Sequence, residues 1–80
     1  MLRNYRKREE KMKIYTQDRQ KIVTIPRELW VSSYGERWAI IGSFYINPVI
    51  GIYETEKRAR EIFDDIFRAY ARGDKTYIMP

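Results

Sequence analysis

The chain has 80 residues, a formal net charge of +5, and neither cysteine nor histidine. The length predicts a single domain, and the composition excludes disulfides, zinc sites of the usual kind, thiol chemistry and the commonest general base near neutral pH. A domain this small buries only about 60% of the surface of its unfolded chain, so further support has to come from a partner subunit, and we expect a homo-oligomer.

The basic character belongs mainly to residues 1–11, which carry five basic and two acidic side chains and leave a net charge of only +2 to residues 12–80. Residues 1–11 have almost no apolar content, so we expect a flexible tail, either frayed helix or disordered, followed by one folded domain over 12–80. The run KREEK before Met12 is also encodable by purine-rich codons, as in a translated ribosome-binding site. The natural start is therefore either Met1 or Met12.

No apolar run approaches the roughly 20 residues of a membrane span, and the first residues lack the apolar core of a signal peptide. The absence of cysteine fits a reducing compartment. The sequence therefore predicts a soluble, cytoplasmic protein without membrane contact.

Runs rich in β-branched and aromatic residues predict five or six strands. The loop QDRQ, the turn at Gly35 and the turn at Asn47-Pro48 separate them, Pro26 ends the second, and Gly42 indicates a bulge or bend. The predicted strands are 12–16, 21–25, 29–34, 37–45, 49–53 and, as a short edge strand, 75–79.

One helix is predicted over residues 55–72, with Thr55 as N-cap and Gly73 as the C′ residue. Its apolar residues recur three and four apart and form one stripe: Ala59, Ile62, Phe63, Ile66, Phe67 and Tyr70. The fold class is therefore α+β. We expect an antiparallel five- to six-stranded meander or half-barrel with one C-terminal helix packed on one face.

A single helix covers one side of a sheet, but the strands are apolar on both sides. In 37–45 one side carries Trp38, Ile40 and Phe44, and the other carries Ala39, Ile41 and Tyr45. Either the sheet curls around its own core, or another subunit buries the second face, and the sequence leaves both open.

The sequence offers no active site. The strand hydroxyls of Ser32, Ser33 and Ser43 have no histidine to activate them. The neighbouring carboxylates Asp64 and Asp65 point about 100° apart on a helix, so they do not form an acid–base pair. The four glycines form no phosphate loop, and no residue set predicts a metal or cofactor. We therefore expect a protein that is not an enzyme.

Aromatic residues are numerous, with seven Tyr, two Trp and three Phe, and several lie with arginines around the hairpin centred on Gly35. Such mixtures are typical of protein interfaces and of surfaces that bind bases or anionic rings, although core and half-exposed strand positions explain them too. The predicted contact residues are Arg27, Trp30, Tyr34, Arg37, Trp38 and Tyr45.

From Met12 onward the chain resembles a group of short, mostly uncharacterised proteins of phages and prophages in Gram-positive bacteria. The matching segments are MKIYTQDRQKIV, IPRELWV, GIYETEKRAREIFDDIF and KTYIMP, in this order over nearly all of 12–80, whereas residues 1–11 fall outside the pattern. The resemblance implies an accessory product of a mobile element in the host cytoplasm, and it transfers no functional residue.

Two functional hypotheses follow. The first is a small, self-associating, non-enzymatic binding protein that captures a host protein or a small anionic, nucleotide-like ligand in counter-defence. The alternative is a nucleic-acid-binding protein that uses the same aromatic and arginine surface together with tail residues Arg3, Arg6, Lys7 and Arg8.

Overall fold

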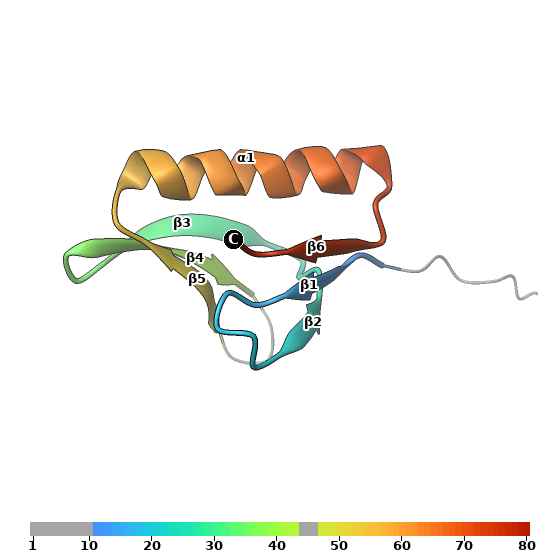
Figure 1. Cartoon of the computed structure of the whole chain (residues 1–80), viewed down its shortest axis with the longest axis horizontal. Helices are drawn as coiled ribbons and strands as arrows, with labels where there is room; N and C mark the ends of the chain where they lie inside the picture. The colour runs from blue at the N-terminus through green and yellow to red at the C-terminus, as the bar shows by residue number, and fades with distance from the viewer. Residues whose placement is uncertain (1–10, 44–46) are drawn as a thin grey trace, which may run out of the picture.

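The computed structural model describes residues 11–43 and 47–80, so the tail arginines and Tyr45 lie outside the described residues. Within this part of the chain, six strands form two small sheets and one helix lies along one side of them (Figure 1). The elements are β1 Lys13–Tyr15, β2 Ile22–Thr24, β3 Leu29–Tyr34, β4 Arg37–Gly42, β5 Val49–Tyr53, α1 Glu56–Arg72 and β6 Thr76–Ile78.

The α+β class is confirmed, but a single meander or half-barrel is wrong. One sheet has the strand order β2-β1-β6 and the other β3-β4-β5. The first is mixed, because β6 pairs in parallel with β1, Lys13 lying opposite Thr76. The meander breaks after β2, where Pro26 cannot donate to a ladder and the next strand turns away to pair with β4 alone.

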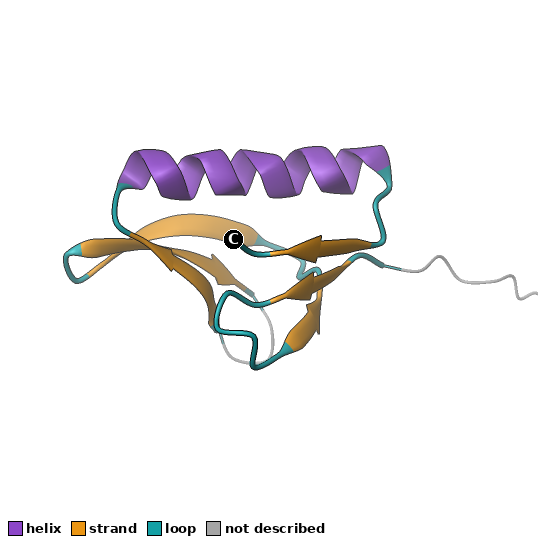
Figure 2. Ribbon diagram, viewed as in Figure 1, coloured by secondary structure: helices purple, strands orange, loops and turns teal. Residues whose placement is uncertain are grey.

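Both ends of α1 are capped as the sequence predicts. The Thr55 side chain accepts a hydrogen bond of 3.1 Å from the Arg58 N–H, and Gly73 has the left-handed φ of 83° that ends helices. The helix packs on β3-β4-β5, and its C-terminal half continues over the other sheet (Figure 2). The helix therefore covers one side of both sheets.

One core joins the two sheets and the helix. The fully buried side chains come from both sheets and from α1, and those of largest volume are Ile14, Ile40, Ile50, Ile66 and Met79. Because each sheet has only three strands, neither encloses a core by itself, and the shared cluster makes them one folding unit.

The β-bulge lies between β4 and β5 and not at Gly42, where the sequence indicates it. Ile40 lies opposite Gly51 and Ile41 opposite Val49, so that β5 has one additional residue, Ile50. The bulge directs Ile50 into the core at 2% exposure. Gly42 is instead the last residue of β4.

Gln17 joins the two sheets at the outer edge of β5. Its N–H donates to the Ile50 carbonyl at 3.0 Å, and its side-chain amide exchanges two hydrogen bonds with the main chain of Ile52, at 3.0 and 2.6 Å. The same amide donates to the Pro80 main-chain oxygen at 3.2 Å, which also accepts from the Tyr53 hydroxyl at 3.1 Å. Gln17 thus satisfies the edge groups of β5 in place of a fourth strand.

Candidate binding surface

A groove of about 840 Å³ runs between the C-terminal half of α1 and the segments that flank the β1–β2 hairpin. Its floor and strand-side wall come from Lys11, Met12 and the linker that joins β2 to β3. The helix supplies the opposite wall. Among the lining residues are Met12, Ile25, Pro26, Leu29, Phe63, Phe67 and Tyr70.

The helix wall carries an aromatic stripe of Phe63, Phe67 and Tyr70, whose spacing of four and three places them on one flank of α1. Phe67 is 64% exposed and Tyr70 55% exposed. The sequence predicts both as part of the core-facing stripe. In the structure, the narrower row Ala59, Ile62, Ile66 and Ala69 fills the core. The predicted apolar stripe spans more of the helix circumference than the row that the core buries. This excess width in the sequence indicates a second, exposed row.

Basic groups without a partner stand across the groove from this stripe. Within the described residues, neither Lys11 nor Arg27 has an ion pair, whereas the Asp74 carboxylate binds Arg72 at 2.6 Å. This bond to Arg72 lowers the pKa of Asp74 and compensates the negative charge of its carboxylate. Asp64 is then the lining carboxylate without an ion pair, so cations outnumber free anions along the groove.

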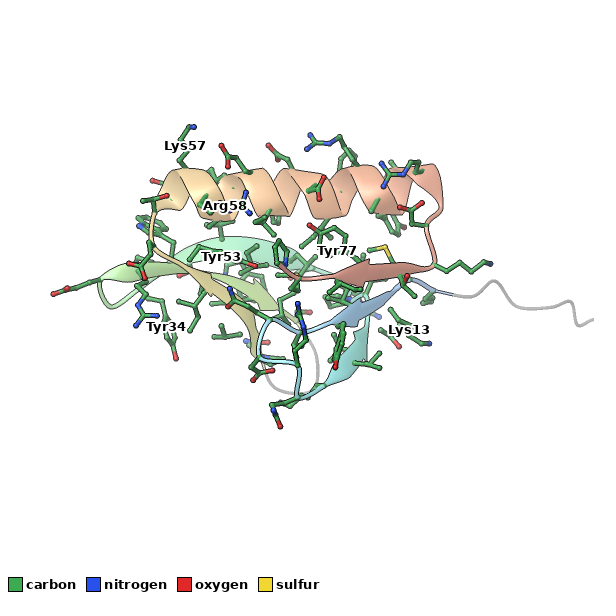
Figure 3. The ribbon with its side chains drawn as sticks, viewed as in Figure 1. Lys13, Tyr34, Tyr53, Lys57, Arg58 and Tyr77 are labelled. Atoms are coloured by element: carbon green, nitrogen blue, oxygen red, sulfur yellow. The ribbon has the colours of Figure 1, made fainter. Side chains whose placement is uncertain are left out.

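The sheet geometry divides the predicted contact residues. Trp30 lies opposite Ile41, and Tyr34 opposite Arg37, on the face of β3-β4-β5 turned away from α1. Figure 3 shows the labelled Tyr34 on the side of the sheet away from the helix. Trp38 lies opposite Tyr53 on the face that packs against the core. Side chains alternate between faces along a strand, so Trp30 and Trp38 cannot belong to one surface.

The other two predicted contact residues lie elsewhere. Arg27 lines the groove beside α1, and Tyr45 lies outside the described residues. The structure therefore brings together Trp30, Tyr34 and Arg37, and it places Arg27 with the helix aromatics that sequence reasoning did not select.

The outer face of β3-β4-β5 is largely apolar. A row of half-buried side chains, Trp30, Ile41 and Val49, crosses the three strands. Ala39 is fully buried on this face although α1 covers the other one, and Ile52 beside it is half-buried. The apolar second face deduced from the sequence is present.

Comparisons with protein-family models, curated proteins and solved structures find no match to this chain. Across residues 11–43 and 47–80, no group of three or more acidic side chains is placed to hold a metal ion. In the same ranges no helix is both long and apolar enough to cross a membrane. The described surface carries groups suited to non-covalent binding, namely exposed aromatic rings, cations without an ion pair among the described residues, and the apolar floor of the groove.

Proposed function

We propose that this chain is a non-enzymatic binding protein whose α1 groove captures a small anionic ligand that carries a flat ring, as a nucleotide does. The observation that carries the proposal is the pairing of exposed Phe67 and Tyr70 with Lys11 and Arg27, which have no ion pair among the described residues, across one groove. Rings stack on rings, and cations hold phosphate or carboxylate.

The size and chemistry of the groove suit such a ligand. Pockets for small molecules have volumes of roughly 300–1,000 Å³, and 840 Å³ lies in that range. Stacking on an aromatic side chain contributes about 1–3 kcal/mol per base, and Arg27 adds a charge-assisted hydrogen bond. In an accessory protein of a phage, sequestering a nucleotide-like signal would act against host defence.

Calorimetric titration with mononucleotides, cyclic mononucleotides and cyclic dinucleotides tests this proposal. At least one should bind, and Phe67→Ala and Arg27→Ala should each weaken it about tenfold or more, equivalent to roughly 1.4 kcal/mol. Tyr34→Ala is the matched control, because Tyr34 is an exposed aromatic on the far side of β3-β4-β5 and should leave binding unchanged.

Two outcomes would contradict the groove as the ligand site. One is the absence of binding for every nucleotide tested while a host protein binds tightly. The other is nucleotide binding that Tyr34→Ala abolishes and Phe67→Ala does not affect.

The alternative function is nucleic-acid binding, favoured by the shared outer face of Trp30, Tyr34 and Arg37. Together with Arg3, Arg6, Lys7 and Arg8 of the tail, this face would stack bases and contact phosphates. Affinity for a single-stranded oligonucleotide should then fall steeply with salt, and deletion of residues 1–11 should weaken it strongly. Affinity that is flat with salt would contradict this function.

A further inference from the structure

The four strand edges of the two sheets are not protected equally. Gln17 covers the outer edge of β5, as described above. β2 and β6 are edges of only three residues each, and Lys21 and Lys75 flank them. β3 is the remaining edge. It is six residues long and consists of LWVSSY, without a charged side chain or a proline.

Two hydrogen bonds define which way the main chain of β3 faces. The Ser43 N–H donates to the Glu28 carbonyl at 2.9 Å, and the Gly42 N–H donates to the Pro48 carbonyl at 3.2 Å. In an antiparallel ladder the bonding direction alternates, so Trp30, Ser32 and Tyr34 bond to β4. The N–H and C=O groups of Leu29, Val31 and Ser33 therefore point outward.

These outward groups have almost no partner. Within the described part of the chain, the only hydrogen bond on them is the one that the Ser32 hydroxyl donates to the Ser33 carbonyl at 3.2 Å. A carbonyl accepts two hydrogen bonds, so Ser33 keeps a free acceptor site. A long, uncharged edge with free donors and acceptors is a template for another strand, and natural proteins block such edges unless they use them.

We propose that two copies of this chain associate through their β3 edges, antiparallel about a two-fold axis at Val31, and form one six-stranded sheet. The occupant is a second copy because the strand complements itself. In this register Leu29 of one copy lies opposite Ser33 of the other, and Val31 lies opposite Val31. Each outward residue then exchanges both main-chain bonds.

The side chains fit the same register. Trp30 lies opposite Ser32 of the second copy, a large side chain beside a small one. Its ring is diagonal to the Trp30 and Tyr34 rings of that copy, within reach for aromatic contact. Moving the two-fold axis by one residue, to Ser32, would set Leu29 opposite Gly35 in the turn that follows β3, so that only Val31 and Ser33 would pair. The Val31 register is therefore the one that pairs all three outward residues.

This inference does not rest on the ligand proposed for the α1 groove, although Leu29 of the β3 edge also lines that groove. It requires only the β3 edge, and it gives the half-buried Trp30 and the exposed Tyr34 a contact, because Trp30 of one copy lies diagonal to Trp30 and Tyr34 of the other. It also supplies the partner subunit that the short chain leads one to expect.

Sedimentation equilibrium over a wide concentration range tests the proposal. The protein should form dimers, and Ser33→Lys, at an exposed position, should raise the dimer dissociation constant at least about tenfold. Ser33→Pro, which deletes an outward N–H, should do the same. Thr76→Lys is the control, because it adds the same charge to an edge of the other sheet and should leave the dimer intact.

The register has its own measurement. Because the chain lacks cysteine, a Tyr34→Cys variant accepts one spin label per subunit. Residue 34 lies opposite residue 28 of the second copy, so the two labelled backbones should be about 20 Å apart at roughly 3.4 Å per residue. A protein that stays monomeric at the highest concentration, or a dimer unaffected by both Ser33 variants, would overturn the proposal.

Discussion

The two flanks of α1 are built differently. On the flank toward β5 and β6, the Tyr77 hydroxyl donates to the Asp65 carboxylate at 2.8 Å, and Tyr53 and Met79 are buried. On the flank toward β3, Phe67 and Tyr70 stand exposed over the groove. The flank toward β5 and β6, called the closed flank below, therefore stabilises the fold. The flank toward β3, called the open flank, presents large apolar side chains that no described residue covers.

The closed flank is also where distant parts of the chain meet. The Met79 N–H donates to the Tyr15 carbonyl at 3.0 Å, and the Arg19 guanidinium donates to the Met79 carbonyl at 2.8 Å. Gln17 adds its bonds to Ile52 and Pro80. Polar groups on this side are satisfied by main chain far away in sequence, so substitutions here should affect stability, whereas substitutions on the open flank should affect binding.

The largest effect is expected at Met79, which is fully buried between the two sheets. Met79→Ala should lower the free energy of unfolding by about 2–5 kcal/mol, through lost burial and the cavity that remains. Urea denaturation measures the loss. Met79→Leu, which keeps the volume, should cost less than about 1.5 kcal/mol.

Gly51 provides a second test of the packing around Met79. A Cβ atom at Gly51 would lie 2.9 Å from the Met79 Cε and 2.8 Å from the Tyr53 hydroxyl oxygen. Gly51→Ala should be destabilising alone and less costly in the Met79→Ala background, where the methyl group gains room. Strict additivity of the two changes would show that these residues do not share packing space.

The second largest effect is expected at Gln17. Gln17→Ala removes the side-chain partners of Ile52 and leaves part-buried main-chain groups for water to satisfy, at a cost of about 1–3 kcal/mol. Gln20 is the matched control, since within the described residues its amide donates only to the Asp18 carbonyl in the same exposed loop. If Gln17→Ala and Gln20→Ala unfold at the same urea concentration, Gln17 does not join the sheets.

Alkaline pH should lower the free energy of unfolding, because tyrosines of the closed flank lose their protons. Burial raises the pKa of Tyr53 to about 12 from its ordinary 10.0, so the unfolded chain loses this proton first. Stability from this group is complete below about pH 10 and is lost as pH rises through about 12. Burial, and then the hydrogen bond to Asp65, raise the pKa of Tyr77 as well.

Unfolding free energies measured at a series of pH values from neutral to strongly alkaline check this prediction. Tyr53→Phe should be less stable at neutral pH, because the bond to Pro80 is lost, but it should lose less stability on going to high pH. Equal alkaline losses in the wild-type protein and in a variant lacking both Tyr53 and Tyr77 hydroxyls would contradict the prediction.

The smallest effect is expected on the open flank. Phe67→Ser should change the free energy of unfolding by no more than about 0.5 kcal/mol, because the ring is 64% exposed. Ile66 is the adjacent helix residue and is 1% exposed, so Ile66→Ala should cost about 2–5 kcal/mol. Similar losses for the two neighbours would mean that the flank is not open in solution.

Local signals in the sequence predict the elements well. The QDRQ loop, the Gly35 turn and the caps at Thr55 and Gly73 each act within a few residues, and the structure has a hairpin or a helix end at each. The turn places Gly35 at φ 64°, a conformation that side chains with a Cβ rarely adopt.

Nonlocal pairing explains the difference in architecture. Parallel pairing of β6 with β1 depends on residues far apart in the chain, and no local pattern indicates it. Gln17 looks like an ordinary loop residue until β5 lies beside it. The split into two sheets follows from these contacts.

The candidate site was partly predictable. Side chains alternate between the two faces of a strand, and this alternation along β3 and β4 already places Trp30 and Trp38 on opposite faces. The prediction that both belong to one contact surface did not apply this rule. The groove depends on where α1 crosses the β2–β3 linker, which is a tertiary relation. Among the described members of the predicted set, only Arg27 lines the groove.

The pairing of the first strand with the last has a consequence during synthesis. While the chain grows, β1 and β2 leave the ribosome long before their third strand exists, and Ile14 remains without the Tyr77 and Met79 that enclose it. Vectorial folding from the N-terminus is therefore blocked for this half of the molecule. We expect nascent chains that stop before Thr76 to stay susceptible to protease, and compaction to occur only after the final strand has emerged.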